Sequence, residues 1–154
     1  MLTIHLSPEA QTAITNACRR AGARETGGML FGEHLAEDVF RVVEATVAGT
    51  GTASSFVRNI FTSIGHLNRF FRRTRHDYRR FNYLGEWHSH PSFALSPSTA
   101  DDRAMFEIVN DPGTGARFAV SLIVRLRGGV LQASAFAYFP GQERDETGVA
   151  LFFE

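Results

Sequence analysis

The chain has 154 residues, 44% of them hydrophobic, and this length and composition predict one globular domain over residues 1–154 with a buried core. Sixteen basic residues balance sixteen acidic ones, which argues against a protein that binds nucleic acid through its overall charge. No apolar run reaches the length of a membrane span, and no secretory signal pattern is present. The single cysteine, Cys18, cannot form an internal disulfide, so we expect a cytoplasmic protein.

The first helix is predicted between Ser7 and Gly22. Ser7 is a favoured N-cap, and Pro8 suits the first helical position because its missing N–H needs no partner there. Glycine at position 22 suits a helix C-terminus. Apolar residues recur at helical spacing between these ends and include Cys18, which we expect to be a core thiol and not a nucleophile.

Two strands and a second helix follow. The apolar segment 27–34 predicts a buried strand, the alternating segment 38–47 predicts the next strand, and residues 48–55 predict a loop or hairpin connection. A helix is predicted over 60–78. Its expected buried stripe comprises Ile60, Ile64, Leu67, Phe71, Thr74 and Tyr78. The arginines that lie mostly outside this stripe are Arg69, Arg72, Arg73, Arg75, Arg79 and Arg80, and we expect them to form a solvated face.

The second half of the chain predicts a strand over 81–90, a loop that contains two prolines, and a third helix that begins near Ser98. This helix is expected to bury Ala104, Met105, Ile108 and Val109. Residues 117–139 predict a β-hairpin, and the tail 140–154 is polar before it ends in an apolar stretch. Helices that interleave with a sheet containing a hairpin indicate an α/β or α+β fold with a mixed sheet.

Two histidines at the end of the strand predicted over 81–90 are candidate metal ligands. Side chains at positions i and i+2 of a strand point to the same face, so His88 and His90 project together. The following loop can return the chain to the start of the third helix, where Asp101 lies. Two imidazoles and one carboxylate suit Zn²⁺, and three protein ligands leave a position for a water whose pKa falls to about 7.

Each part of this pattern also has a structural explanation. A His-x-His pair is common as a polar strand end, and residues 98–101 are also an acceptable helix N-terminus with an acid in its first turn. A hydrolase built on this site would also need a general base. The candidates are Glu25, Glu33, Glu44 and Glu86. Glu25 precedes the first buried strand and Glu86 shares the face of the histidines, and the residues alone leave both open.

Together these residues resemble the JAMM (JAB/MPN) zinc metallopeptidases. The resemblance rests on Glu25 in ETGGMLFG, the His-Ser-His-Pro run at 88–91, and the Ser-x-x-Asp pattern at 98–101. It implies an MPN (JAB) domain, a mixed curved β-sheet flanked by helices that is similar to the cytidine deaminase fold. A deaminase itself is not expected, because its H-x-E and P-C-x-x-C motifs are absent.

The resemblance implies a role for each residue. His88, His90 and Asp101 would bind one zinc ion, Glu25 would be the general acid/base, and Ser98 would stabilise the tetrahedral intermediate. The implied activity is that of an isopeptidase or peptidase that cleaves after the C-terminus of a ubiquitin-like protein.

The motif context looks closest to compact bacterial JAB proteins found beside ubiquitin-like conjugation enzymes in antiphage operons. The implied partners are a ubiquitin-like protein, its conjugates, and E1- and E2-like conjugating enzymes; a membrane and nucleic acid are not expected as partners. Two alternatives remain at this point. One is a JAB peptidase that processes a sulfur-carrier protein, and the other is a binding module that uses the arginine-rich helix.

Overall fold

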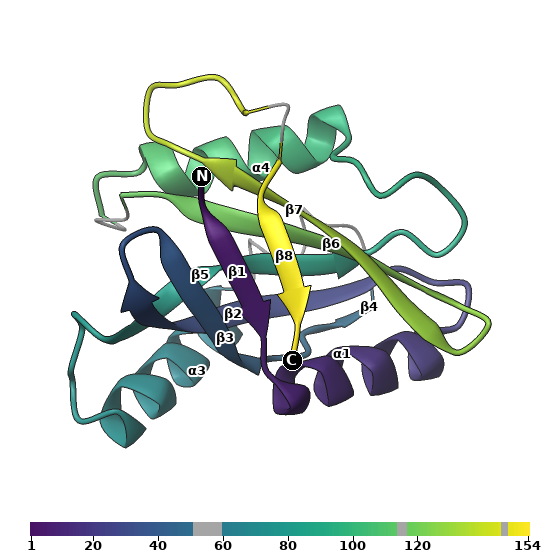
Figure 1. Cartoon of the computed structure of the whole chain (residues 1–154), viewed down its shortest axis with the longest axis horizontal. Coiled ribbons are helices and arrows are strands. Elements are labelled where there is room, and N and C mark those ends of the chain that lie inside the picture. The colour runs from purple at the N-terminus through teal and green to yellow at the C-terminus, as the bar shows by residue number, and fades with distance from the viewer. Residues whose placement is uncertain (51–59, 114–116, 146–147) are drawn as a thin grey trace.

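The computed structural model describes residues 1–50, 60–113, 117–145 and 148–154, and a mixed eight-stranded sheet lies at its centre (Figure 1). The strands are β1 Thr3–Leu6, β2 Thr26–Ala36, β3 Val39–Ala45, β4 Gly49–Thr50, β5 Phe81–Ser89, β6 Ala119–Arg127, β7 Val130–Tyr138 and β8 Ala150–Phe153. Helices α1 Pro8–Ala21, α3 Ile60–Arg73 and α4 Thr99–Asn110 flank it in the described ranges. The predicted fold class, a mixed sheet with flanking helices, is confirmed.

Strand β5 is an interior strand of the sheet, whose order is β7-β6-β5-β2-β3-β1-β8, with β4 paired to β2. It runs antiparallel to β2 and parallel to β6, so both of its edges are hydrogen-bonded. Glycines let these neighbours approach closely. A Cβ atom on Gly85, whose φ is 157°, would lie 1.9 Å from the Val120 carbonyl oxygen, and one on Gly28 would lie 1.9 Å from that of Thr46.

Helix α1 has the ends predicted from its sequence. The Ser7 hydroxyl accepts a hydrogen bond from the Ala10 amide, and Gly22, at φ 61°, donates its own amide to the Cys18 carbonyl. Cys18 is buried against the sheet, as expected, and burial raises the pKa of its thiol. Trp87 of β5 is 1% exposed in the same core.

Helix α3 corrects the predicted buried stripe. Ile64 and Tyr78, both predicted to be buried, are 48% and 53% exposed, and Tyr78 lies beyond the end of the helix. The side chain of Ile60 lies outside the described part of the chain. The residue that enters the core is Phe70, 1% exposed, whose ring stacks on Phe31 of β2 at 4.5 Å. Leu67 and Phe71 pack beside this pair, and Thr74 is half-buried. The stripe is therefore confirmed at Leu67 and Phe71 and wrong at Ile64 and Tyr78, and it omitted Phe70.

The shorter helix has a local cause. Arg75 and His76 both adopt the left-handed region, at φ 57° and 58°, and the His76 amide donates to the Phe71 carbonyl, which ends the helix after Arg73. Arg73 forms an ion pair with Glu44 of β3. Arg80 forms a second ion pair, with Glu33. All six arginines of the predicted solvated face are exposed, including these two: Arg69, Arg72, Arg73, Arg75, Arg79 and Arg80.

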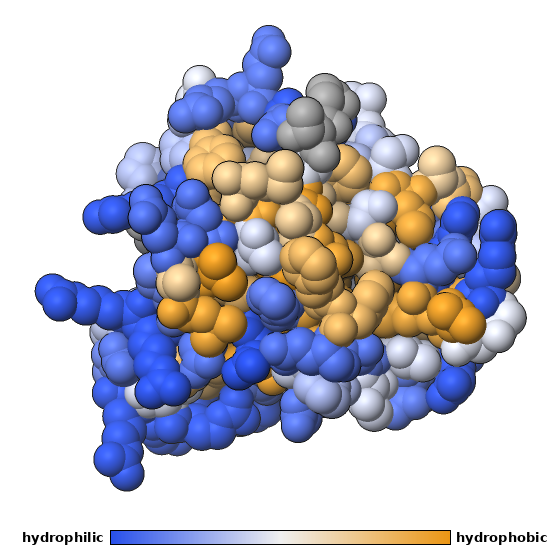
Figure 2. All heavy atoms as spheres, viewed as in Figure 1, coloured by the Kyte–Doolittle hydropathy of each residue, from blue (hydrophilic) through white to orange (hydrophobic). Residues whose placement is uncertain are grey.

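The two termini form strands that the sequence analysis did not assign. Strand β1 pairs in parallel with β3 and with β8, so the apolar end of the tail completes one edge of the sheet. Glu154 accepts a bidentate contact from Arg41, and its carbonyl accepts a hydrogen bond from Gln11 of α1. Figure 1 shows β1 and β8 side by side, and Figure 2 shows apolar side chains gathered over this face. Phe152 and Phe153 of β8 are each about half exposed, at 51% and 46%.

Strand β4 begins the segment predicted as a loop or hairpin, whose remaining residues, 51–55, lie outside the described part. The hairpin predicted over 117–139 is confirmed as β6 and β7. Helix α4 buries Ala104, Met105 and Val109 as predicted, and Ile108 is half-buried. Within the described ranges, no helix combines the length and apolar character that crossing a membrane requires.

Candidate metal centre

Three side chains predicted as ligands meet at the end of β5. The Nε2 atoms of His88 and His90 lie 2.9 Å apart, and each lies 3.3 Å from Oδ2 of Asp101 in the first turn of α4. All three side chains are buried, with exposures of 5%, 2% and 5%. The central strand and the helix N-terminus therefore bring two imidazoles and one carboxylate to a single point.

The spacing of these atoms fits a metal ion. Ligand atoms placed tetrahedrally at about 2.0–2.2 Å from zinc lie roughly 3.3–3.6 Å from one another. The three observed separations fall at or slightly below this range. Two imidazole nitrogens and a carboxylate oxygen are also donor types that zinc takes. This cluster, His88, His90 and Asp101, could thus hold a divalent ion.

The loop after β5 orients His90. Its Nδ1 atom lies 2.8 Å from the Ala94 carbonyl oxygen, which can only accept, so Nδ1 carries a proton and Nε2 is the ring nitrogen turned toward Asp101. The Phe93 ring stacks on the imidazole at 4.2 Å. Burial lowers the pKa of His90, but its contacts with Asp101 and the Ala94 carbonyl outweigh this effect and raise it overall.

Asp101 is held by the start of its own helix. Its amide donates to the Ser98 hydroxyl at 3.2 Å, and its Oδ2 accepts from the Ser98 amide at 2.8 Å. Burial would raise the pKa of Asp101, but hydrogen bonds from His88 and His90 and from the Ser98 amide hold it well below its usual range. The carboxyl group is therefore ionised and ready to bind a cation.

Glu25 lies next to this cluster. Gly27 pairs with His88 across the β2–β5 ladder, and the Thr26 amide donates to the Ser89 hydroxyl at 3.0 Å. Glu25 directly precedes β2 and His90 directly follows β5, so both residues lie just beyond this end of the ladder. Glu25 is half-buried, and its negative charge is among the groups that raise the pKa of His90. The structure thus brings the predicted acid/base candidate beside the predicted ligands.

The other candidate bases lie in different surroundings. Glu33 pairs with Arg41 and Arg80 near the opposite end of β5, and Glu44 pairs with Arg73. Glu86 accepts a hydrogen bond from the Tyr83 hydroxyl at 2.8 Å, and its other oxygen is buried without a partner in the described part of the chain. Burial raises the pKa of Glu86 to about 8, against the opposing effect of the Tyr83 hydrogen bond.

Ser98 is the exposed N-cap of α4, and its amide and hydroxyl both contact Asp101. The hydroxyl accepts from the Asp101 amide and still has its own proton to donate. An exposed donor next to a candidate metal ligand suits the role expected of it.

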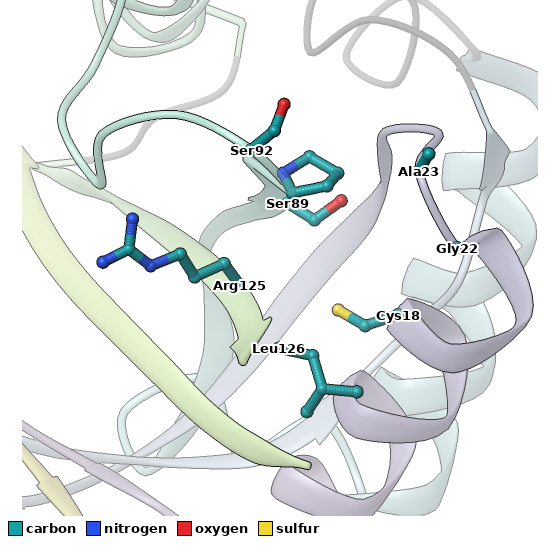
Figure 3. Close-up of a pocket in the computed structure, with 8 residues that line it drawn as sticks. Cys18, Gly22, Ala23, Ser89, Ser92, Arg125 and Leu126 are labelled. Carbon is teal, nitrogen blue, oxygen red and sulfur yellow. The ribbon is translucent and has the colours of Figure 1, made fainter. Parts of the chain in front are cut away.

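A separate hollow lies behind β5. It has a volume of about 200 Å³ and is lined by residues that include Cys18 of α1, Ser89 of β5 and Arg125 of β6 (Figure 3). Ser89 points away from the face of its neighbours His88 and His90, because successive strand residues alternate between faces. This hollow is therefore distinct from the metal cluster.

The model of the family described as prokaryotic homologs of the JAB domain matches residues 7–138. The chain belongs to the JAB family. This JAB domain is also 31% identical over 115 residues to a curated protein of Enterobacter hormaechei subsp. hoffmannii (strain UCI 50) that is named "CD-NTase/cGAS isopeptidase". The alignment covers 70% of the chain and 59% of that relative's length.

A solved structure has a similar fold. A protein from Desulfitobacterium hafniense, determined in solution, is 18% identical and superposes with a TM-score of 0.70 over 98% of this chain and 92% of that one. A JAB1/MPN domain protein from Archaeoglobus fulgidus aligns over 97% of both chains, at 17% identity and a TM-score of 0.49.

Some contacts at the site were not found from the sequence. The Thr26–Ser89 hydrogen bond, the Phe93 ring on His90 and the Ala94 carbonyl all support the cluster. Thr26 and Ser89 are 63 positions apart, so no local pattern reveals their contact. The proximity of Phe93 and Ala94 to the histidine motif was the only available signal for the other two.

Proposed function

We propose that this JAB domain is a zinc-dependent isopeptidase that cleaves after the C-terminus of a ubiquitin-like protein. The observation that carries the proposal is the buried triangle of His88, His90 and Asp101 with Glu25 beside it. The named isopeptidase activity of the curated relative supports a hydrolase that removes a protein modifier. The chain aligns with 59% of that relative's length, so the substrate and the partners of this chain are proposed as well.

Each residue would contribute one function. His88, His90 and the ionised Asp101 would hold zinc, which supplies Lewis acidity and lowers the pKa of a water molecule to about 7. Glu25 would take a proton from the attacking water and deliver it to the departing amine. The exposed Ser98 hydroxyl would donate a hydrogen bond to the scissile carbonyl oxygen as negative charge develops there.

The sheet offers a route for an extended substrate. Strand β4 pairs with β2 at Thr26 and Gly27, the two residues that follow Glu25. Its other side pairs with no strand in the described part of the sheet. A flexible C-terminal tail could add there as a strand, because main-chain hydrogen bonds to a sheet edge accept many sequences. Such pairing would deliver the scissile bond toward Glu25.

The biological setting follows from the same reasoning. The relative's name suggests a modified protein in a CD-NTase system as the substrate. The motif resemblance adds E1- and E2-like conjugating enzymes and a defence pathway to the proposal. The buried, free thiol of Cys18 suits the reducing cytoplasm.

The decisive experiment compares the chain with its Glu25→Gln variant on two substrates, a ubiquitin-like protein fused to a reporter and the same protein joined to a lysine side chain. We expect cleavage by the unmodified chain, loss of cleavage with a chelator, and a 10²–10⁴-fold lower rate for Glu25→Gln because the proton carrier is gone. Glu107→Gln, an exposed carboxyl on α4, is the matched control and should cleave normally.

Cleavage that survives both the chelator and the Glu25→Gln change would refute the proposed mechanism. Cleavage of the fusion but not of the lysine-linked conjugate would indicate precursor processing, and a panel that includes sulfur-carrier proteins would identify that alternative.

A further inference from the structure

A second carboxylate at the start of α4 connects the candidate metal site to the end of the chain. Asp102 follows Asp101, and its Oδ1 accepts hydrogen bonds from the Tyr138 hydroxyl at 2.6 Å and from Nε of Arg144 at 2.8 Å. Tyr138, the last residue of β7, is fully buried. One oxygen atom thus joins the first turn of α4 to the sheet and to the segment after β7.

Arg144 is itself held in place. Its side chain is 13% exposed, and its guanidinium carbon lies 5.3 Å from the centre of the Phe136 ring. The same segment contacts the other end of α4, where the Gly141 amide donates to Oδ1 of Asn110 at 3.0 Å. The residues after β7 therefore run along α4 and attach to it at both ends.

The position of Asp101 depends on this first turn. Its carboxylate can lie 3.3 Å from both imidazoles only if the N-terminus of α4 has one fixed position against β5. The capping contacts with Ser98 are local to the helix and its preceding loop, so they do not fix the helix against the sheet. Met105 and Val109 pack against Ala119 and Tyr138 and hold the body of the helix on the sheet. The Asp102 contacts attach its first turn.

We propose that Asp102, Tyr138 and Arg144 form a clamp that positions Asp101 for metal binding. Arg144 lies outside the segment that matches the family model, which ends at Tyr138. The inference rests on the proposed function only in naming zinc as the ion. Asp102 acts through Asp101 and is a positioning residue, as are Tyr138 and Arg144.

The test uses the full chain with Arg144→Ala, Tyr138→Phe and Arg144→Lys, and with Arg103→Ala, an exposed arginine on the same helix, as the control. Two quantities are measured. Amide hydrogen exchange of the α4 first turn is followed in the metal-free protein, and zinc affinity is measured by competition with a chelator. Arg144→Ala should exchange faster in that turn and bind zinc about 10-fold more weakly, a typical effect of losing an outer contact of a metal site.

The remaining variants separate positioning from general stability. Tyr138→Phe removes one hydroxyl and should weaken zinc binding in the same direction, Arg144→Lys should restore part of the affinity, and Arg103→Ala should match the unmodified chain. A lower melting temperature for Arg144→Ala with unchanged exchange in the first turn and unchanged zinc affinity would overturn the clamp. If the unmodified chain bound no zinc, the proposed function would fail, whereas the exchange measurement would still decide the clamp.

Discussion

At the scale of single residues, the end of β5 combines groups whose charges are set by burial. Asp101 stays ionised because two imidazoles and an amide stabilise its negative charge inside the protein. Glu86, two positions before His88, has only the Tyr83 hydroxyl as a hydrogen-bond donor, so burial favours its neutral form. The two carboxyl groups thus differ in charge at neutral pH.

The raised pKa of Glu86 predicts a pH effect on stability in the metal-free protein. The unfolded chain ionises this group near its ordinary value of 4.5 and the folded chain near 8, so the folded state binds more protons between these values. The free energy of unfolding should therefore fall as pH rises through this window, by up to about 1.4 kcal/mol per pH unit. In Glu86→Gln this contribution is absent.

Urea unfolding at pH 5 and pH 8 measures the effect. The free energy of unfolding of Glu86→Gln, minus that of the unmodified chain, should be more positive at pH 8 than at pH 5. Glu107→Gln, which alters an exposed carboxyl, serves as the control. An equal difference at both pH values for Glu86→Gln would show that Glu86 ionises at the same pH in both states.

At the scale of elements, two helices begin in the same way but serve different purposes. Ser7 caps α1 by accepting from the Ala10 amide, and Ser98 caps α4 by accepting from the Asp101 amide. Only the second cap lies at the metal cluster. Both were predicted from the sequence, because an N-cap is decided by residues three positions apart.

This pair separates capping from catalysis. Ser7→Ala and Ser98→Ala should each lower the free energy of unfolding by about 1 kcal/mol, because each leaves a helix N-terminal amide without its acceptor. Only Ser98→Ala should also lower kcat, by about 10²–10³-fold, through the lost hydrogen bond to the developing oxyanion. Thermal unfolding and cleavage kinetics on the same samples check both effects. Equal kcat values for the two variants would show that Ser98 caps the helix and has no role in catalysis.

At the scale of the whole molecule, the sheet assembles the site from distant segments. Glu25 enters with β2, the histidines with β5, and Asp101 with α4, which is held by a residue close to the C-terminus. Strands β1 and β8 close the opposite edge of the sheet and tie both termini into the fold.

Metal binding should therefore stabilise the whole fold. A ligand that binds only the folded state raises the free energy of unfolding by about 2.7 kcal/mol when its concentration is 100 times its Kd. We expect zinc at that excess to raise the melting temperature and a chelator to reverse the rise. His88→Ala should abolish the zinc effect, and His66→Ala, a change on α3 away from the cluster, should retain it. A zinc effect that persisted in His88→Ala would place the ion elsewhere.

The sequence by itself determined the features that depend on near neighbours: the caps at Ser7 and Ser98, the buried face of α1, and the shared face of His88 and His90. These follow from backbone geometry over a few positions, which the local residues control. Even locally, the end of α3 was missed, because Arg75 and His76 adopt a left-handed conformation that their residue types do not announce.

Only the tertiary structure decided which distant segments meet. The parallel pairing of β1 with β8, the β2–β5 pairing that brings Glu25 near His90, and the contact of Arg144 with Asp102 all join residues far apart in the chain. Such contacts depend on how the whole sheet packs with its helices, and a short stretch of sequence does not determine that packing. For this reason Glu25 and Glu86 remained equal candidates from the residues alone, and the fold separates them by what surrounds each carboxyl group.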